Sequence, residues 1–259
     1  MTEIKENKVV LEHDIKNEQL ISILAHDLKN PFTALIGFSE LLNSSFLQGD
    51  KKETLDCITI INQTLWQTYR MLEDILLWSK VHSGKLSCNF QKINLKKIVQ
   101  EITESMIVTA NINNINIEYF VNDEIDVFAD IDMLKAILRN LILYSFKSTN
   151  HGDTMKIVAS IDENLKNVVK LNISNGRFEL HPTHENFRDN SFEVSFDTKI
   201  SSCIDNQHPQ DFGLIICKEF IEKHNGKFCI KQHAIKGQSD KWPSPDRSTF
   251  IFTIPLSRI

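Results

Sequence analysis

A heptad repeat of apolar residues near the N-terminus limits the fold of this 259-residue chain more than any other feature. Residues 10–82 contain one proline, Pro31, and few glycines. Apolar positions recur there at alternating steps of three and four residues: Ile21, Leu24, Leu28, Pro31, Leu35, Phe38 and Leu42. After a break at residues 48–50, a second series follows: Ile58, Ile61, Leu65, Thr68, Leu72 and Ile75. The spacing predicts two long helices, each with one apolar seam.

A single pair of such helices cannot bury both seams completely. Two copies of the hairpin can bury them together by forming a four-helix bundle. We therefore predict a homodimer formed through residues 10–82.

The remainder of the chain mixes helical and strand patterns. Helices are expected at 94–106, from Asp130 or Asp132 to 146, and at 212–224, where Asn225–Gly226 can end the helix. Strands are expected at 115–121, 155–161, 168–174, 228–230 and 249–254, and residues 177–212 are polar and irregular. The sequence predicts an α+β protein, with a helical hairpin domain at residues 1–85 and an α/β sandwich at residues 90–259.

Charge and composition exclude several classes of partner. The formal net charge is −5, which does not favour nucleic acid or an anionic membrane surface. No apolar run approaches the roughly 18 residues that a membrane helix needs, and the N-terminus is charged throughout. The five cysteines are scattered and odd in number, which fits reduced thiols. We expect a cytoplasmic protein with no nucleic-acid or membrane partner.

His26 has the sequence environment of a phosphoryl carrier. In the first heptad series it takes position f, which faces solvent, while Asp27 takes position g and Asn30 position c. Asp27 can orient the imidazole as a neutral nucleophile. A lone exposed histidine is usually ordinary surface. Pro31 argues against that interpretation here, because a proline inside a helix costs about 3 kcal/mol.

Residues 25–32, Ala-His-Asp-Leu-Lys-Asn-Pro-Phe, resemble the phosphoacceptor box of sensor histidine kinases, and residues 33–42 resemble its continuation. The resemblance implies that His26 is phosphorylated, that Asp27 is its acid–base partner, and that Asn30 positions water when a response regulator is dephosphorylated. It also implies a response regulator receiver domain as partner. Another histidine kinase or sensor protein is a further candidate partner.

The resemblance extends into the second domain. Residues 130–141 resemble the start of the family's N box, which continues to Lys147. Residues 212–218 resemble the second half of its second glycine box, and residues 248–256 resemble its terminal strand. It implies a histidine-kinase-like ATPase domain that binds ATP and Mg²⁺. The retained candidates for nucleotide binding are Asn140, Lys147, Gly176 and Gly213.

Several positions depart from the family's nucleotide motifs. Tyr144 stands where an asparagine normally helps to hold Mg²⁺, and a phenol is a poor ligand for that ion. Ser174 aligns with the aspartate that normally binds the adenine amino group, and Phe178 replaces a glycine. Two further glycines are missing near residues 207–211. The sequence therefore predicts a degenerate ATP site with weak or no binding.

Three functions remain open from the sequence. The first is phosphotransfer or regulator dephosphorylation at His26 with little autokinase activity. The second is an ordinary ATP-dependent histidine kinase with a divergent pocket. The third is a non-catalytic module that binds a regulator or a kinase. A metal site at the H-x-x-H spacing of His181 and His184 is a minor alternative, since no carboxylate or cysteine lies beside the two histidines.

Overall fold

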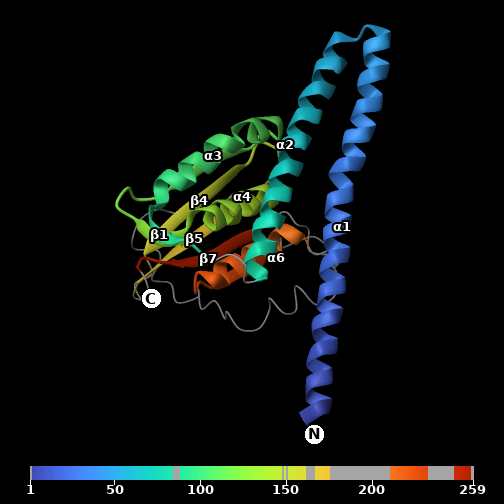
Figure 1. Ribbon diagram of the computed structural model, residues 1–259. Coiled ribbons are helices and arrows are strands. Elements are labelled where there is room, and N and C mark those ends of the chain that lie inside the picture. Colours follow the sequence, from blue (N-terminus) through green and yellow to red (C-terminus); the bar gives the residue numbers. More distant parts are fainter. Residues whose placement is uncertain are drawn as a thin grey trace, which may run out of the picture. The chain divides into compact units, whose positions relative to one another are not determined.

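The structure, a computed structural model, describes residues 2–83, 88–147, 149, 151–161, 167–175, 211–232 and 248–257. It divides into two compact units, each described here by itself. The first comprises Met1–Leu77 with Pro209–Ile215, and the second comprises Trp78–His208 with Ile216–Ile259. A helical hairpin followed by a mixed sheet with helices confirms the predicted α+β class (Figure 1).

The hairpin consists of α1 (Thr2–Gln48) and α2 (Lys51–His82). Gly49 has φ 75°, the left-handed conformation that glycine adopts without strain and that ends α1. The amide of Asp50 reaches back to the carbonyl of Ser45 at 3.0 Å, and the amide of Gly49 to that of Phe46 at 3.2 Å. This is a Schellman turn. Asp50 Oδ1 then accepts the amide of Glu53 at 3.0 Å, so one residue ends the turn and caps α2.

Burial along the hairpin follows the predicted heptads only in part. Six of the seven seam positions of α1 are half-buried: Leu24, Leu28, Pro31, Leu35, Phe38 and Leu42. On α2, Ile61, Thr68 and Ile75 are half-buried or buried, whereas Ile58, Leu65 and Leu72 are exposed. Two helices can cover only one line of side chains on each other, so half of the α2 seam remains open in the single chain.

The second unit contains a five-stranded sheet in the order β2-β4-β5-β7-β6. Its strands are β2 (Asn116–Phe120), β4 (Thr154–Ile161), β5 (Val168–Asn175), β6 (Phe228–Gln232) and β7 (Ser248–Pro255). β2 and β4 are parallel, and the other pairs are antiparallel. A separate antiparallel pair joins β1 (Phe90–Asn94) to β3 (Asp126–Asp130). All five strands expected from the sequence are present, and β1 and β3 are additional.

Among the described residues of this unit, three helices accompany the sheet: α3 (Leu95–Ile112), α4 (Ile131–Lys147) and α6 (Phe212–Lys223). α3 packs against α4 and β2, and α4 packs against β5 (Figure 1). Asp130 begins α4 by accepting the amides of Asp132 and Met133 at 3.1 and 3.2 Å. The core between α4 and the sheet is fully buried at Leu134, Leu138, Leu141, Phe250 and Phe252.

α6 ends as the sequence predicts. Asn225 has φ 54°, and the amide of Gly226 reaches the carbonyl of Ile221 at 2.9 Å. A Cβ added at Gly226 would lie 2.0 Å from the carbonyl oxygen of Thr253. Only glycine therefore allows the end of α6 to approach β7 this closely.

Candidate functional site

His26 lies on an exposed face of α1, as its heptad position predicts. Its side chain is 56% exposed, and its Nδ1 lies 3.1 Å from Oδ1 of Asp27. An ionised carboxylate can only accept a hydrogen bond, so this contact favours the tautomer that carries its proton on Nδ1. The lone pair of His26 is then on Nε2 and available for attack on phosphorus.

Asp27 is held at both carboxylate oxygens. Its second oxygen, Oδ2, accepts the backbone N–H of Phe212 at 2.9 Å. Phe212 belongs to the segment Pro209–Ile215, which forms part of the same compact unit as the hairpin. The side chain of Asp27 is only 19% exposed, and its orientation toward His26 is therefore fixed. Nothing in the sequence signalled this backbone contact.

Asn30 and Pro31 follow on the same helix. Asn30 is exposed one turn after His26, so the structure brings together His26, Asp27 and Asn30. Pro31 lies inside α1 and has no N–H to donate to the carbonyl of Asp27. The catalytic roles of these three polar residues remain predictions.

The retained and altered residues of the N box share one face of α4. Asn140, Tyr144 and Lys147 follow at steps of four and three residues. The amide nitrogen of Asn140 donates to the carbonyl of Ala136 at 2.9 Å. The ring of Tyr144 packs edge-on against Phe250, with centroids 5.3 Å apart, and Lys147 Nζ lies 5.8 Å from the Tyr144 centroid. Tyr144 is thus packed against the sheet.

At the end of β5, the structure places the adjacent residues Ser174 and Asn175 on opposite faces of the sheet. Ile173 pairs with Phe250, whose ring contacts Tyr144, so the face bearing Ile173 is the one covered by α4. Side chains alternate along a strand, and Asn175 therefore lies on this face while Ser174 lies on the opposite one. Both residues are 3% exposed. Ser174 therefore faces away from α4, and Asn175 is the polar residue on the α4 side.

The structure gives less information on the other predicted positions. Gly213 lies in the first turn of α6, where its N–H donates to Oδ1 of Asp211 at 3.0 Å and so takes part in the helix cap. Gly176, Phe178, His181 and His184 lie outside the described residues. Among the residues that the structure describes, no cluster of histidine, cysteine and carboxylate side chains is suited to a metal ion.

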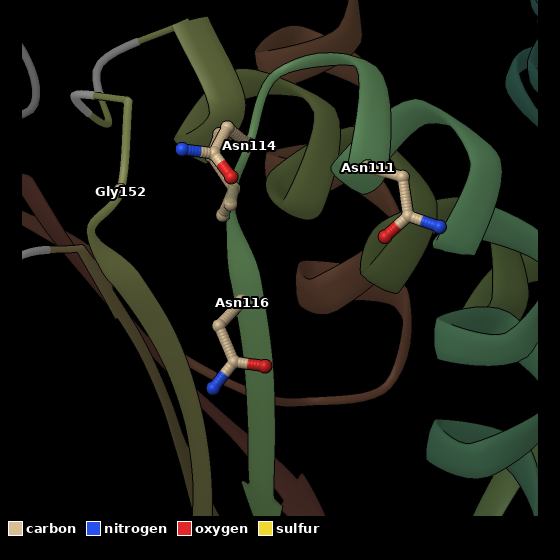
Figure 2. A pocket seen from close by; sticks show the side chains of 5 residues that line it. Asn111, Asn114, Asn116 and Gly152 are labelled. Carbon is tan, nitrogen blue, oxygen red and sulfur yellow. The ribbon is translucent and has the colours of Figure 1, made fainter.

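A cavity of about 270 Å³ lies apart from the residues singled out by the sequence. It is lined by Asn111, Asn114, Ile115, Asn116 and Gly152. Figure 2 shows the asparagine side chains along the end of α3 and the start of β2. No helix in the described part of the chain is long and apolar enough to cross a membrane.

Comparison with known proteins agrees with the predicted order of domains. A family model described as "His Kinase A (phospho-acceptor) domain" matches residues 16–84. A second, described as "Histidine kinase-, DNA gyrase B-, and HSP90-like ATPase", matches residues 129–258. The sensor histidine kinase YclK of Bacillus subtilis (strain 168) is 24% identical over 243 residues, which cover 93% of this chain and 47% of that protein. The chain thus spans about half the length of this relative.

Two solved structures share the fold across both domains. The histidine kinase AdeS of Acinetobacter baumannii has a TM-score of 0.54 and 15% identity, and the match covers 90% of this chain and 98% of that one. Histidine kinase ThkA, solved in complex with response regulator protein TrrA, has a TM-score of 0.51 and 20% identity, with 90% and 60% covered. Because the two family models match the hairpin and the sheet domain in order, and the second alone spans half of the sequence, this chain belongs to the two-component sensor histidine kinase family.

Proposed function

We propose that this chain carries a phosphoryl group on His26 and exchanges it with the receiver domain of a response regulator in the cytoplasm. The observation that carries the proposal is the exposed imidazole whose Nδ1 is held by Asp27 at 3.1 Å. A phosphoryl carrier must be reached first by a donor and then by an acceptor, so its ring must be exposed. Its attacking nitrogen must also keep a lone pair, which a fixed tautomer provides.

The transfer step needs only groups of the chain and the regulator. The Nε2 lone pair of His26 forms a bond to phosphorus as the bond between phosphorus and the aspartyl oxygen of the regulator breaks. The electron pair leaves with that oxygen, and Asp27 stabilises the charge on the imidazole through the Nδ1 proton. In dephosphorylation, a water oxygen oriented by Asn30 attacks the phosphorus, and aspartate and inorganic phosphate are released.

The solved complex of ThkA with TrrA supports a receiver domain as partner, since that relative of the fold carries a response regulator. The residue pair His26–Asp27 and the exposed Asn30 form the polar surface that such a domain would meet. Another histidine kinase or a sensor protein is the other partner that we consider.

We further propose that the hairpin dimerises. The exposed part of α2 carries a second apolar stripe at helical spacing, which we call the α2 stripe: Leu55, Ile58, Leu65, Tyr69, Leu72 and Leu76. Each of these side chains is at least 39% exposed in the single chain. A contiguous stripe of this kind is expected to be covered by a partner, and a second copy offers the same stripe in a four-helix bundle.

The described residues fit the two expected cofactors unequally. Mg²⁺ prefers hard oxygen ligands, and the family's second asparagine is replaced by Tyr144, whose ring is packed on Phe250. The ligand that the family provides at this position is therefore missing, and we draw no step of the reaction through Mg²⁺. Asn175 retains a polar group on the α4 side of β5, where the base of a nucleotide would be recognised. This position favours a second candidate function, an ATP-dependent histidine kinase with a divergent pocket.

Labelling distinguishes the candidate functions. The protein is incubated either with a ³²P-phosphorylated receiver domain or with γ-³²P-ATP and Mg²⁺. We expect the protein to take acid-labile label from the receiver domain. This label should be lost in His26→Ala and kept in the control His151→Ala. Rapid label from ATP would favour the kinase, and no label from either donor would favour a binding module. Asn30→Ala should slow receiver dephosphorylation while leaving transfer to His26 intact.

A further inference from the structure

The last turn of α2 is joined to α6 by a cluster of three side chains that the proposed function does not use. The indole N–H of Trp78 donates to Oε2 of Glu219 at 2.5 Å, and His82 Nδ1 lies 3.0 Å from Oε1 of the same carboxylate. The rings of Trp78 and His82 are stacked, with centroids 4.9 Å apart and planes 24° apart. All three residues lie in the second compact unit. We call this cluster the Glu219 clasp.

The geometry of the clasp is specific. An indole nitrogen can only donate a hydrogen bond and a carboxylate can only accept, so each oxygen of Glu219 has its own donor. Stacking aligns the two rings so that both nitrogens are directed at one carboxylate. Glu219 is 22% exposed, so water competes only in part, and hydrogen bonds to a charged group are stronger than neutral ones.

Both helices extend the clasp to functional parts of the chain. α2 is one helix from Lys51 to His82, and the boundary between the compact units falls within it, after Leu77. α6 begins at Phe212 and Gly213, which lie in the segment that resembles the family's second glycine box. Glu219 lies six residues after Gly213, about 9 Å along the helix axis. A helix of this length is stiff, so a side chain that fixes its middle also fixes its first turn.

We propose that Glu219 is a positioning residue, which fixes the first turn of α6 by holding α6 to the last turn of α2. The inference rests on the proposed function for its purpose, since the first turn of α6 belongs to the predicted nucleotide site. Within the second compact unit, the last turn of α2 and the middle of α6 are linked through this carboxylate.

The test is amide exchange and NMR on the full chain, which needs no activity. In Glu219→Leu, the indole signal identified by Trp78→Phe moves upfield, and exchange at Phe212 and Gly213 rises on the order of tenfold, the scale of coupling between sites. Glu219→Gln still accepts from the indole and donates to His82, so it keeps both signals near those of the wild type. Glu222→Leu, an exposed glutamate on the same helix, is the matched control and changes neither.

The Trp78→Phe variant provides the decisive comparison because it removes the N–H and leaves the stacked ring. Its effect on exchange at Gly213 should not add to that of Glu219→Leu, since both break one hydrogen bond. An indole signal that is unmoved in Glu219→Leu overturns the clasp. Additive effects on Gly213 overturn the positioning role. If wild-type His26 takes no label, the proposed function fails, while these signals still decide the clasp.

Discussion

Asn175 and Ser174 are adjacent, yet only Asn175 lies on the sheet face covered by α4. We expect wild-type ATP binding to be weak, with a dissociation constant above about 1 mM. Asn175→Asp should tighten it about tenfold, because a hydrogen bond to a carboxylate is roughly 1.4 kcal/mol stronger than one to an amide. Calorimetry with ATP and Mg²⁺ measures the change.

Ser174→Asp is the matched control. It would bury a carboxylate on the opposite face of the sheet, so it should not improve ATP binding and should lower the thermal midpoint. If Ser174→Asp bound ATP more tightly and Asn175→Asp did not, Ser174 would be the residue that corresponds to the adenine-binding aspartate, as the sequence alignment suggested.

His224 makes the second unit sensitive to pH. It is 1% exposed, Nδ1 donates to the carbonyl of Phe220 at 2.6 Å, and Nε2 accepts the amide of Asp130 at 3.0 Å. Burial lowers the pKa of His224 below its ordinary value of 6.5, and the smaller effects of the Phe220 carbonyl and of Asp130 oppose this. The folded protein therefore holds a neutral ring at a pH where the unfolded chain binds a proton.

The sign of the pH effect follows from this difference. Above pH 6.5 both states are neutral at His224, and the free energy of unfolding is unaffected. As the pH falls below 6.5 the unfolded state is favoured, by about 1.4 kcal/mol for each unit of pKa lowering, until the folded ring also protonates. Urea unfolding between pH 7.5 and 5 should show this loss. His224→Phe should flatten the slope and His151→Ala should keep it, whereas an unchanged slope in His224→Phe would contradict the assignment.

For single residues, the sequence predicted the solvent-exposed position of His26 and a helix cap at Asp130 or Asp132, of which the structure has Asp130. It did not distinguish Ser174 from Asn175, because motif alignment ignores the alternation of side chains along a strand. The order Val169, Leu171, Ile173 already indicates which positions are in the core. The hydrogen bond from Phe212 to Asp27 depends on tertiary structure, which no local pattern encodes.

At the level of the elements, some apolar residues of the hairpin pack between α1 and α2, and others lie on the proposed dimer surface. Leu65 belongs to the exposed α2 stripe, whereas Leu35 is half-buried within the hairpin. Leu65→Glu should give a folded monomer, because it adds charge only to the proposed dimer surface. Leu35→Glu should lower both helicity and assembly. Light scattering and circular dichroism measure the two properties, and a wild type that is monomeric at micromolar concentration would contradict dimerisation.

The junction between α6 and β7 tolerates no side chain at Gly226. Gly226→Ala must push its Cβ away from the carbonyl of Thr253, so we expect a loss of about 2 kcal/mol in stability. Gly37 is the contrast, because a Cβ there meets nothing within 4 Å and alanine favours a helix by up to about 1 kcal/mol. Thermal unfolding compares the two variants. Equal midpoints would mean that the end of α6 and β7 are not packed as described.

The elements themselves were largely predictable. Helices and strands with regular spacing were found within a few residues, because burial of one face imposes the period. β1 and β3 were missed, and β1 shows no alternation because it has a single buried position, Ile93. α3 continues six residues beyond the expected end because Asn114, with φ 52°, closes it.

For the molecule as a whole, family membership and the site geometry support different statements. The two matched domains establish a histidine kinase architecture. The packing of Tyr144 against Phe250 is the observation behind our proposal that ATP binds weakly. Both candidate enzymatic functions require phosphorylation of the same nitrogen, Nε2 of His26.

The most direct test is NMR of the full chain, ¹⁵N-labelled at histidine, after phosphorylation by a phosphorylated receiver domain. We expect a phosphorus–nitrogen coupling at Nε2 of His26, with Nδ1 still hydrogen-bonded to Asp27. Asp27→Asn should reduce the yield while leaving the same nitrogen modified. Phosphorus bonded to Nδ1 of His26, or to another histidine, would contradict phosphoryl transfer through Nε2 of His26.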